Sequence, residues 1–366
     1  MKAIWIALLG VALLAGSATG ASTGGSIDLV AYSTPKDAYG KVISAFQKTQ
    51  AGNGVNVSQS YGASGDQARA VAAGQPADIV ALSLDPDVSL LVQKNLVPKN
   101  WNANSHQGIV SDSVVVFVVR DGNPKKIKGW GDLVKSGVQV ITPNPFTSGG
   151  ARWNVMAAYG AQRRAGKTDK QAIAYLYKLF HHVPVQPDSA RTALQIFAQG
   201  KGDVLLTYEN EAIYANKKGI HTDYRIPKAT LLIETPAALT KTGLGKPAAK
   251  AFYKYLWSST AQKVFADQGY RPVVKSVATS YHFYKPPGLF TIGSSKYGLN
   301  GWVKVNKRFF HPEKGIHGRG REVDWPVTQQ SSSDRPARLQ AAPVARLRRE
   351  SRPATSAWSC SCRSRR

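Results

Sequence analysis

The sequence predicts an α/β protein built from two lobes. Segments with strand-like and helix-like patterns alternate between Ile27 and about Lys314, as they do in α/β folds. Residues 114–119 read VVVFVV, and such a β-branched run is typical of a strand buried on both faces. The chain has 366 residues, of which 43% are hydrophobic. This length exceeds what one core usually serves and favours two.

The expected elements follow one another closely along the body of the chain. We expect strands at residues 27–32, from 55, and at 78–82, 113–120, 138–142, 183–185 and 204–207, and helices at 38–49, 66–73, 88–95, 150–165, 169–180 and 189–199. Their order predicts mostly parallel sheets. In such sheets the ligand loops lie where a strand ends and a helix begins.

The first 21 residues predict a secretory signal peptide. Lys2 is followed by an apolar stretch at 3–15 and by small residues at 17–20, which is the pattern of an exported protein. A short N-terminal anchor is the alternative, although the stretch is shorter than the roughly 20 residues of a membrane-spanning helix. No Cys directly follows the apolar stretch. The two cysteines of the sequence, Cys360 and Cys362, lie near its C-terminal end, so the body of the chain has no disulfide framework. We therefore expect a periplasmic location.

The composition changes at residue 316. Residues 317–366 contain 11 Arg, 4 acidic residues and no Lys, and their lack of an apolar period predicts disorder for 316–366. A frameshifted gene end is one interpretation, and a basic arm for polyanions is the other. The net charge of +26 is typical of nucleic-acid binding. The export signal and the uneven distribution of charge argue against that function.

Four loops place a hydroxyl group and small residues directly before an expected helix. They are residues 32–35 (YSTP), 61–66 (YGASGD), 145–151 (PFTSGGA) and 187–191 (PDSAR). A helix N-terminus offers unpaired N–H groups and a partial positive charge, and glycine lets an anion approach them. Ordinary N-caps and turns use the same residues. Several such loops together favour an anion pocket.

Catalytic and metal-binding patterns are weak. Residues 62–66 (GASGD) approach the G-x-S-x-G nucleophile elbow, but Asp66 stands where glycine is required. His181 and His182 are adjacent and cannot point along one helix face, so we interpret them as a helix-end pair rather than a metal site. For Glu209 and Glu211 we expect solvated or capping roles. We expect no enzyme, no metal and no cofactor.

Residues 140–154 (VITPNPFTSGGARWN) closely resemble the signature of the periplasmic sulfate-binding proteins of ABC importers. Further segments resemble the family in the same order: residues 59–69 (QSYGASGDQAR), 76–80 (PADIV), 202–205 (GDVL), 208–212 (YENEA) and 270–272 (YRP). The resemblance covers about residues 27–314.

The resemblance implies a type II periplasmic binding protein fold with a ligand cleft between two lobes. Lobe 1 would comprise residues 22–111 and 227–315, and lobe 2 residues 112–226, with a final crossing by a C-terminal helical segment as an option. The protein would act as a monomer that captures sulfate and delivers it to the membrane permease subunits of an ABC importer, without nucleic acid. The ligand residues it implies are Ser33, Ser64, Ser148, Gly149, Gly150, Ala151, Arg152, Ser189, Ala190, Arg191 and Tyr208.

Two positions depart from the family pattern. Tyr208 replaces the usual Trp before Glu-Asn, and the usual Asp of the first loop is replaced near Ser33. Because of these changes, thiosulfate or another tetrahedral oxyanion, such as molybdate or phosphate, is the alternative ligand. An esterase using Ser64 or Ser148 and a polyanion-binding surface protein are the competing functional classes.

Overall fold

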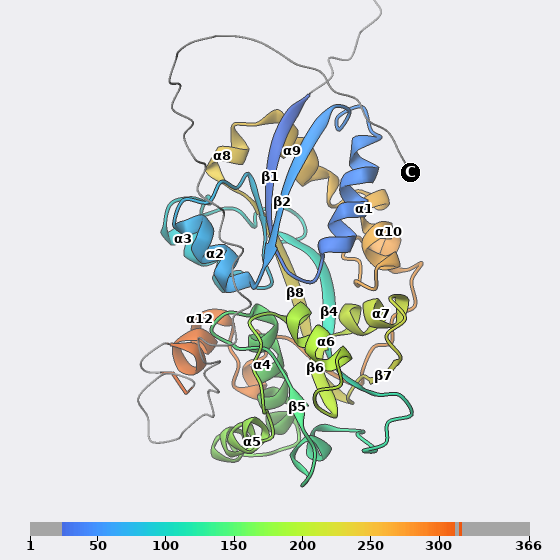
Figure 1. Cartoon of the computed structure of the whole chain (residues 1–366). Coiled ribbons are helices and arrows are strands. Elements are labelled where there is room, and N and C mark those ends of the chain that lie inside the picture. Colours follow the sequence, from blue (N-terminus) through green and yellow to red (C-terminus); the bar gives the residue numbers. More distant parts are fainter. Residues whose placement is uncertain (1–23, 312–314, 317–366) are drawn as a thin grey trace, which may run out of the picture. The chain divides into compact units, whose positions relative to one another are not determined.

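The structure, a computed structural model, describes residues 24–311, 315 and 316. The expected signal peptide and the tail from residue 317 onward lie outside the described residues. Within the described part, strands and helices alternate along most of the chain (Figure 1).

As far as residue 208 the elements agree with the expected ones in most places, whereas no helix or strand with stated bounds was expected after residue 207. The strands are β1 (Gly25–Tyr32), β2 (Val55–Gly62), β3 (Ile79–Ala81), β4 (Ile109–Arg120), β5 (Val140–Ile141), β6 (Val204–Tyr208), β7 (Thr222–Arg225), β8 (Ala229–Leu239) and β9 (Gly288–Phe290). The α-helices are α1 (Lys36–Gln47), α2 (Ser64–Ala72), α3 (Asp85–Gln93), α4 (Gly149–Arg164), α5 (Asp169–His181), α6 (Ala190–Ala198), α7 (Glu209–Lys217), α8 (Lys241–Leu244), α9 (Pro247–Tyr255), α10 (Ser259–Asp267), α11 (Lys275–Ala278) and α12 (Trp302–Val305). Short 3-10 helices occupy Trp130–Val134 and Ser295–Tyr297, and a π-helical turn occupies Asn306–Phe310.

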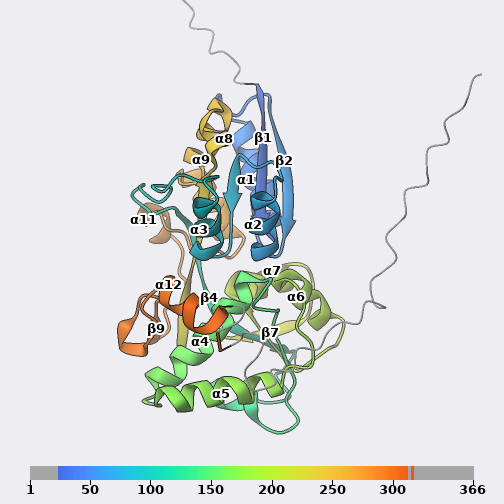
Figure 2. The ribbon, with the colours of Figure 1, turned by 90° about the vertical axis from the view of Figure 1, so that its left-hand side faces the viewer.

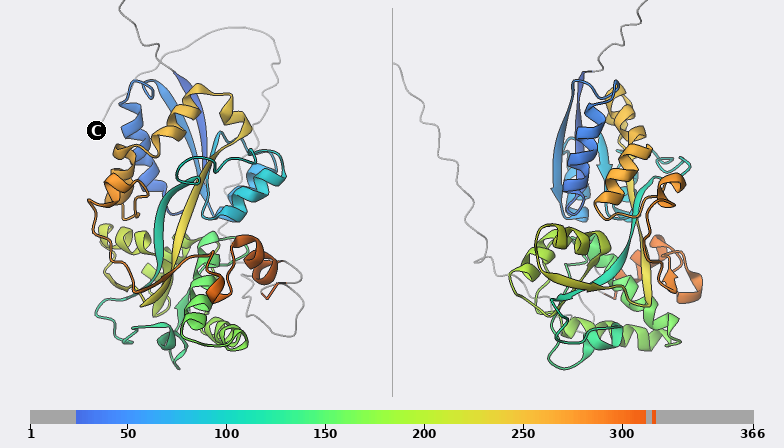
Figure 3. Two further views of the ribbon diagram at one scale, coloured as in Figure 1. Left: turned by 180° about the vertical axis from the view of Figure 1, so that it is seen from behind. Right: turned by 90° about the vertical axis from the view of Figure 1, so that its right-hand side faces the viewer.

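The expectation of mostly parallel sheets was wrong, because the sheet is mixed. Its order is β2-β1-β3-β8-β4-β6-β5, with β7 beside β4 and β9 beside β8. The pairs of β1 with β2 and β3 are parallel, as are β5 with β6 and β8 with β9. The long strands β4 and β8 run antiparallel to each other; β4 is also antiparallel to β6 and β7, and β8 is antiparallel to β3. Figure 3 shows these two strands side by side.

Strand β4 changes partner in its middle. Ile109 to Val114 pair with β8, whereas Val115 to Val119 pair with β6. Strand β8 behaves similarly, because its first residues pair with β9 and its last residues with β3. These two strands therefore connect the β1–β3 part of the sheet to the β5–β7 part.

The β-branched run in β4 is buried on both faces, as predicted. Val115, Phe117 and Val119 belong to a hydrophobic cluster with α4 and α5, and the alternate residues Val114 and Val116 belong to a cluster with α6 and α7. Because side chains alternate across a strand, a continuous apolar run can serve two layers at once. The same alternation in β1 divides its side chains between a cluster with α1, α9 and α10 and one with α2 and α3 (Figure 2).

The expected strand at 183–185 is absent from the described structure, where these residues form no ladder. Pro184 has no N–H to donate to a neighbouring strand. The Val183 N–H donates instead to the carbonyl of Phe180, at the end of α5. The sequence pattern did not reveal that this apolar stretch closes a helix.

The segment after β8 returns to α4. Phe290, Trp302 and Phe309 belong to the cluster that contains α4 and α5, and the Trp153 and Trp302 rings lie edge to face with centroids 4.6 Å apart. The assignment of all of 227–315 to one lobe stays a prediction. The final crossing by a C-terminal helical segment likewise stays a prediction.

Candidate functional site

The N-terminus of α4 is the centre of the candidate site. Ser148 is its N-cap, and its Oγ accepts from the N–H of Ala151 at 3.4 Å. Gly149, Gly150 and Ala151 form the first turn and are buried. Among the described residues, the N–H groups of Gly149 and Gly150 have no protein acceptor, as expected for the first turn of a helix.

Both glycines are in close contact with other elements. A Cβ on Gly149 would lie 2.4 Å from Ser83 Oγ and 2.6 Å from Leu84 Cδ2. A Cβ on Gly150 would lie 2.8 Å from Tyr208 Cε2, 3.1 Å from the Tyr208 hydroxyl and 3.3 Å from Ala190 Cβ. Glycine is therefore required here by close packing, and these contacts bring the ends of β3 and β6 and the start of α6 to the start of α4.

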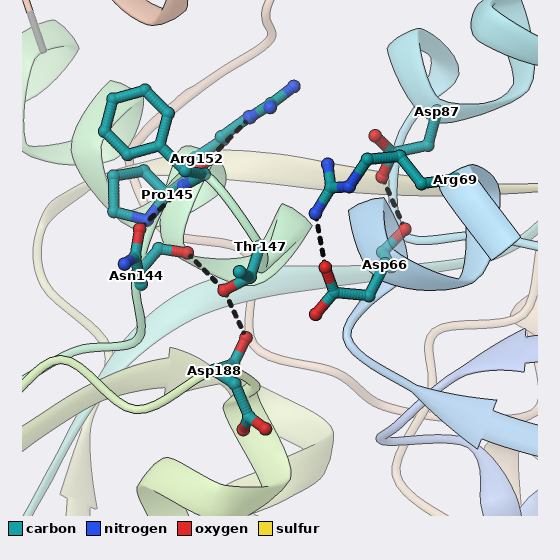
Figure 4. Close-up of polar contacts among 10 residues, drawn as sticks. Asp66, Arg69, Asp87, Asn144, Pro145, Thr147, Arg152 and Asp188 are labelled. Carbon is teal, nitrogen blue, oxygen red and sulfur yellow. Dashed lines mark hydrogen bonds and ion pairs between the residues drawn. The ribbon is translucent and has the colours of Figure 1, made fainter. Parts of the chain in front are cut away.

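The loop before α4 also connects to two other helix N-termini. The Thr147 hydroxyl donates to the carbonyl of Asp188 at 2.7 Å, directly before α6, and Figure 4 shows Thr147 between Asn144 and Asp188. The Gly65 N–H, in the first turn of α2, donates to the Thr147 carbonyl at 2.9 Å. Three helices thus present their N-terminal turns to one region.

Ser64 begins α2 and contacts a buried carboxylate. Its Oγ donates to Asp87 Oδ2 at 2.5 Å and accepts from the Ser83 N–H at 2.9 Å. Burial raises the pKa of Asp87, while Arg152 and Arg69 oppose that effect. The four loops singled out in the sequence did not predict a carboxylate beside Ser64.

Tyr208 ends β6 with its ring fully buried. Its hydroxyl lies 2.6 Å from Ser83 Oγ, and the Tyr32 ring lies 6.0 Å away between centroids. Burial raises the pKa of Tyr208 well above its usual value. Its hydroxyl therefore keeps its proton and can donate a hydrogen bond.

The two predicted arginines use their side chains elsewhere. Arg152 Nε donates to the Pro145 carbonyl at 2.8 Å (Figure 4), and burial lowers the pKa of Arg152. Arg191 donates to both oxygens of Glu211, at 2.8 and 3.0 Å, and to the Thr34 carbonyl at 2.7 Å. The backbone N–H of Arg191 lies in the first turn of α6 and has no acceptor among the described residues.

Ser189 and Ala190 lie at the start of α6, and Ser33 follows β1. Ser189 is the N-cap, with Oγ 3.2 Å from the Thr192 nitrogen. Ala190 contacts the Gly150 region, as described above. Ser33 is half-buried, and no contact joins its side chain to the other predicted site residues in the described structure.

The solvated or capping roles expected for Glu209 and Glu211 were wrong. Both side chains are buried: Glu211 is paired with Arg191, and Glu209 Oε2 accepts from Arg271 Nε at 2.7 Å. Two residues apart on a helix, they face different directions, and each meets an arginine from another segment. Burial raises the pKa of each carboxyl, and its arginine opposes that rise.

Sequence reasoning missed Ser83 and Asp87. The sequence did contain a pattern that could have identified Ser83, because it lies between the expected strand at 78–82 and the next expected helix. The hydroxyl groups of the four loops named in the sequence analysis lie at the same kind of junction.

The histidine pair plays no part here, since His181 and His182 place Nδ1 against the carbonyls of Tyr177 and Val138. Among the described residues, no three His, Cys, Asp or Glu side chains are grouped so as to hold a metal ion. The helices described here also include none long and apolar enough to cross a bilayer.

A family model described as bacterial extracellular solute-binding protein matches residues 27–271. The chain belongs to this family. Curated relatives include the sulfate-binding protein of Synechococcus elongatus, 38% identical over 79% of this chain and 86% of the relative. The thiosulfate-binding protein of Pseudomonas aeruginosa is 33% identical over 85% of this chain and 96% of the relative.

A solved member of the family confirms the predicted fold class. The sulfate-binding protein SubI from Mycobacterium tuberculosis is 43% identical, with a TM-score of 0.75 over 78% of this chain and 99% of SubI. The relatives named here are binding proteins, not enzymes.

Proposed function

We propose that this protein captures sulfate in the periplasm and delivers it to the permease subunits of an ABC importer. The observation that carries the proposal is the start of α4, where Gly149 and Gly150 hold unpaired N–H groups against the buried hydroxyls of Ser83 and Tyr208. The relatives named as sulfate-binding proteins support sulfate as the anion.

The proposed ligand set consists of neutral donors. Backbone N–H groups would come from Gly149, Gly150, Ala151, Ala190 and Arg191, and hydroxyls from Ser148, Ser189 and Tyr208. The Ser64 hydroxyl donates to Asp87 and would have to exchange that bond for one to the anion. Ser33 would join them only if its loop moves when the ligand binds. Arg152 would act by supporting the loop through Pro145.

Neutral donors select a fully ionised anion. Sulfate has no proton at neutral pH, whereas phosphate carries at least one, which needs an acceptor. A buried group without a partner costs about 1–3 kcal/mol, or roughly 5- to 150-fold in affinity. Asp87 is the carboxylate nearest to Ser64, but its Oδ2 is already bound by the Ser64 hydroxyl.

The predicted division into two lobes implies a closing motion. Lobe 1 (22–111 and 227–315) and lobe 2 (112–226) would rotate about β4 and β8, which change partners along their length. In this arrangement α2 and Ser83 belong to one lobe and α4, α6 and Tyr208 to the other. Hinge closure around a ligand is a common motion.

Titration calorimetry of the mature protein with sulfate, thiosulfate, molybdate and phosphate tests the proposal. We expect tight binding of sulfate and weak binding of phosphate. The P. aeruginosa relative makes thiosulfate the main alternative. Absence of sulfate binding together with tight binding of phosphate or molybdate would overturn the assignment.

A further inference from the structure

Ser83 joins three elements through three of its atoms. It is 1% exposed and lies between β3 and α3. Its N–H donates to Ser64 Oγ, and its carbonyl accepts from Trp153 Nε1 in α4 at 2.9 Å. Its Oγ is bound to the Tyr208 hydroxyl. The two backbone bonds hold the main chain of Ser83 in place, and the bond to Tyr208 holds its hydroxyl.

The Ser83 and Tyr208 hydroxyls lie against the first turn of α4. An added Cβ would lie 2.4 Å from Ser83 Oγ at Gly149 and 3.1 Å from the Tyr208 hydroxyl at Gly150, so both oxygens lie against the turn that holds the unpaired N–H groups. A helix N-terminus favours negative charge. The hydroxyl pair is therefore an independent polar feature at the same place.

The two hydroxyl groups have two protons between them, but the hydrogen bond that joins them uses only one. Each hydroxyl has one donor, and a single hydrogen bond of 2.6 Å joins the two oxygens. One O–H therefore donates within the pair and the other has no acceptor among the described residues. A buried donor without an acceptor is destabilising unless a ligand accepts from it.

We propose that Ser83 and Tyr208 act as one donor unit, in which the spare O–H binds an oxygen of the anion at the start of α4. This inference rests on the proposed function and places the Ser83 hydroxyl, instead of the Tyr208 hydroxyl, in direct contact with the anion. A phenol is a stronger acid than an alcohol and therefore the better donor. Tyr208 donates to Ser83 Oγ, and the Ser83 hydroxyl donates to the anion.

Calorimetric sulfate titrations of Ser83→Ala, Tyr208→Phe and the double variant test the unit. We expect Ser83→Ala to weaken sulfate binding about 10- to 100-fold, because it removes the hydrogen bond to a charged ligand. In the double variant the loss should be smaller than the product of the two single losses, since both changes disable one unit. Unchanged affinity in Ser83→Ala, or fully multiplicative losses, would overturn the proposal.

A matched control separates the hydroxyl from a general effect of a buried serine. Ser113 is also 1% exposed, and its Oγ has no hydrogen-bond partner among the described residues. Ser113→Ala should leave the affinity for sulfate unchanged. If Ser83→Ala lowered the melting temperature without changing affinity, Ser83 would be structural only, and the proposal would be wrong.

A crystal structure with bound selenate, a heavier analogue of sulfate, gives a direct measurement. We expect Ser83 Oγ within about 3 Å of an anion oxygen, the usual range for such a bond. A separation beyond about 3.5 Å would overturn the donor unit. Failure of the wild-type protein to bind sulfate at all would instead overturn the proposed function, so the two failures are distinguishable.

Discussion

At the scale of single residues, glycine is required in the first turn of α4 for steric reasons. Gly149 and Gly150 leave no room for a Cβ beside Ser83, Leu84 and Tyr208. The requirement does not come from the left-handed backbone region, because neither glycine has a positive φ. It comes from the approach of other elements to the helix terminus.

We expect Gly150→Ala to weaken sulfate binding at least about tenfold, since its Cβ would displace the Tyr208 ring by overpacking the buried turn. Gly150→Asp should abolish binding, because it places a carboxylate where the anion would lie. Calorimetry measures both effects, and circular dichroism checks that each variant folds.

Gly40 in α1 provides the control for the alanine variant. An added Cβ there would meet nothing within 4 Å, so Gly40→Ala should keep full affinity and stabilise α1 slightly. Full affinity in Gly150→Ala as well would place the anion elsewhere.

At the scale of elements, the salt bridge between α6 and α7 is buried. Arg191 is 15% exposed at its side chain and Glu211 is 0% exposed. Burial lowers the pKa of Arg191, but the Glu211 carboxylate outweighs that effect and raises it. The pair therefore stays ionised, and each partner depends on the other.

Arg191→Met should destabilise the protein by about 3–5 kcal/mol, because it leaves the Glu211 charge buried and unpaired. Urea unfolding measures the change. Arg69→Met is the matched control, since Arg69 and Asp66 are about half exposed and such pairs contribute about 0–1 kcal/mol. Equal losses in the two variants would contradict the importance of burial.

The two connecting strands place like charges opposite each other. Asp112 of β4 pairs in register with Glu234 of β8, and its backbone bridges to Arg271. Burial raises the pKa of Asp112 to about 7, with a further rise from Glu234 and a decrease from Arg271. Burial raises the pKa of Glu234 as well.

Because the folded state binds the Asp112 proton more tightly than the unfolded chain, stability should fall as the pH rises from about 4 to about 7. The contribution of this proton is fully present at low pH and is lost above the folded pKa. Asp112→Asn should flatten the slope and stabilise the protein at pH 8 by on the order of 1–3 kcal/mol. Urea unfolding at several pH values measures the effect.

The exposed Asp121 supplies the comparison. Asp121→Asn should keep the slope of the wild-type protein. A wild-type slope retained in Asp112→Asn would show that this carboxyl does not produce it.

At the scale of the whole molecule, the proposed anion would bridge elements on both sides of β4 and β8. Ser64 and Ser83 lie in the region of β1–β3, and α4, α6 and Tyr208 lie beyond the point where β4 changes partner. A ligand that binds only the folded, closed protein must stabilise it.

Sulfate at about 1,000 times its dissociation constant should raise the unfolding free energy by about 4 kcal/mol. A thermal melt in sulfate, compared with one in chloride of equal ionic strength, measures this shift. Equal melting temperatures in the two salts would contradict specific sulfate capture.

Most of the fold was predictable because it depends on local patterns. The alternation of elements, the buried run in β4 and the Ser148 and Ser189 caps depend on residues within a few positions of each other. The strands β7, β8 and β9 and the helices α7 to α12 were not predicted. The stretch around Pro184 shows the opposite error. Its apolar residues predicted a strand at 183–185, but Pro184 has no N–H to donate to a neighbouring strand.

The sequence by itself determined the α/β class, the helix termini suited to an anion and the resemblance to sulfate-binding proteins. Only the tertiary structure decided that β4 and β8 run antiparallel, that Arg191 serves Glu211, and that Ser83 meets Tyr208. The physical reason is separation along the chain: Ser83 and Tyr208 are 125 residues apart, and no local period records which distant side chains will meet. Packing decides those partners, and with them the chemistry of the candidate site.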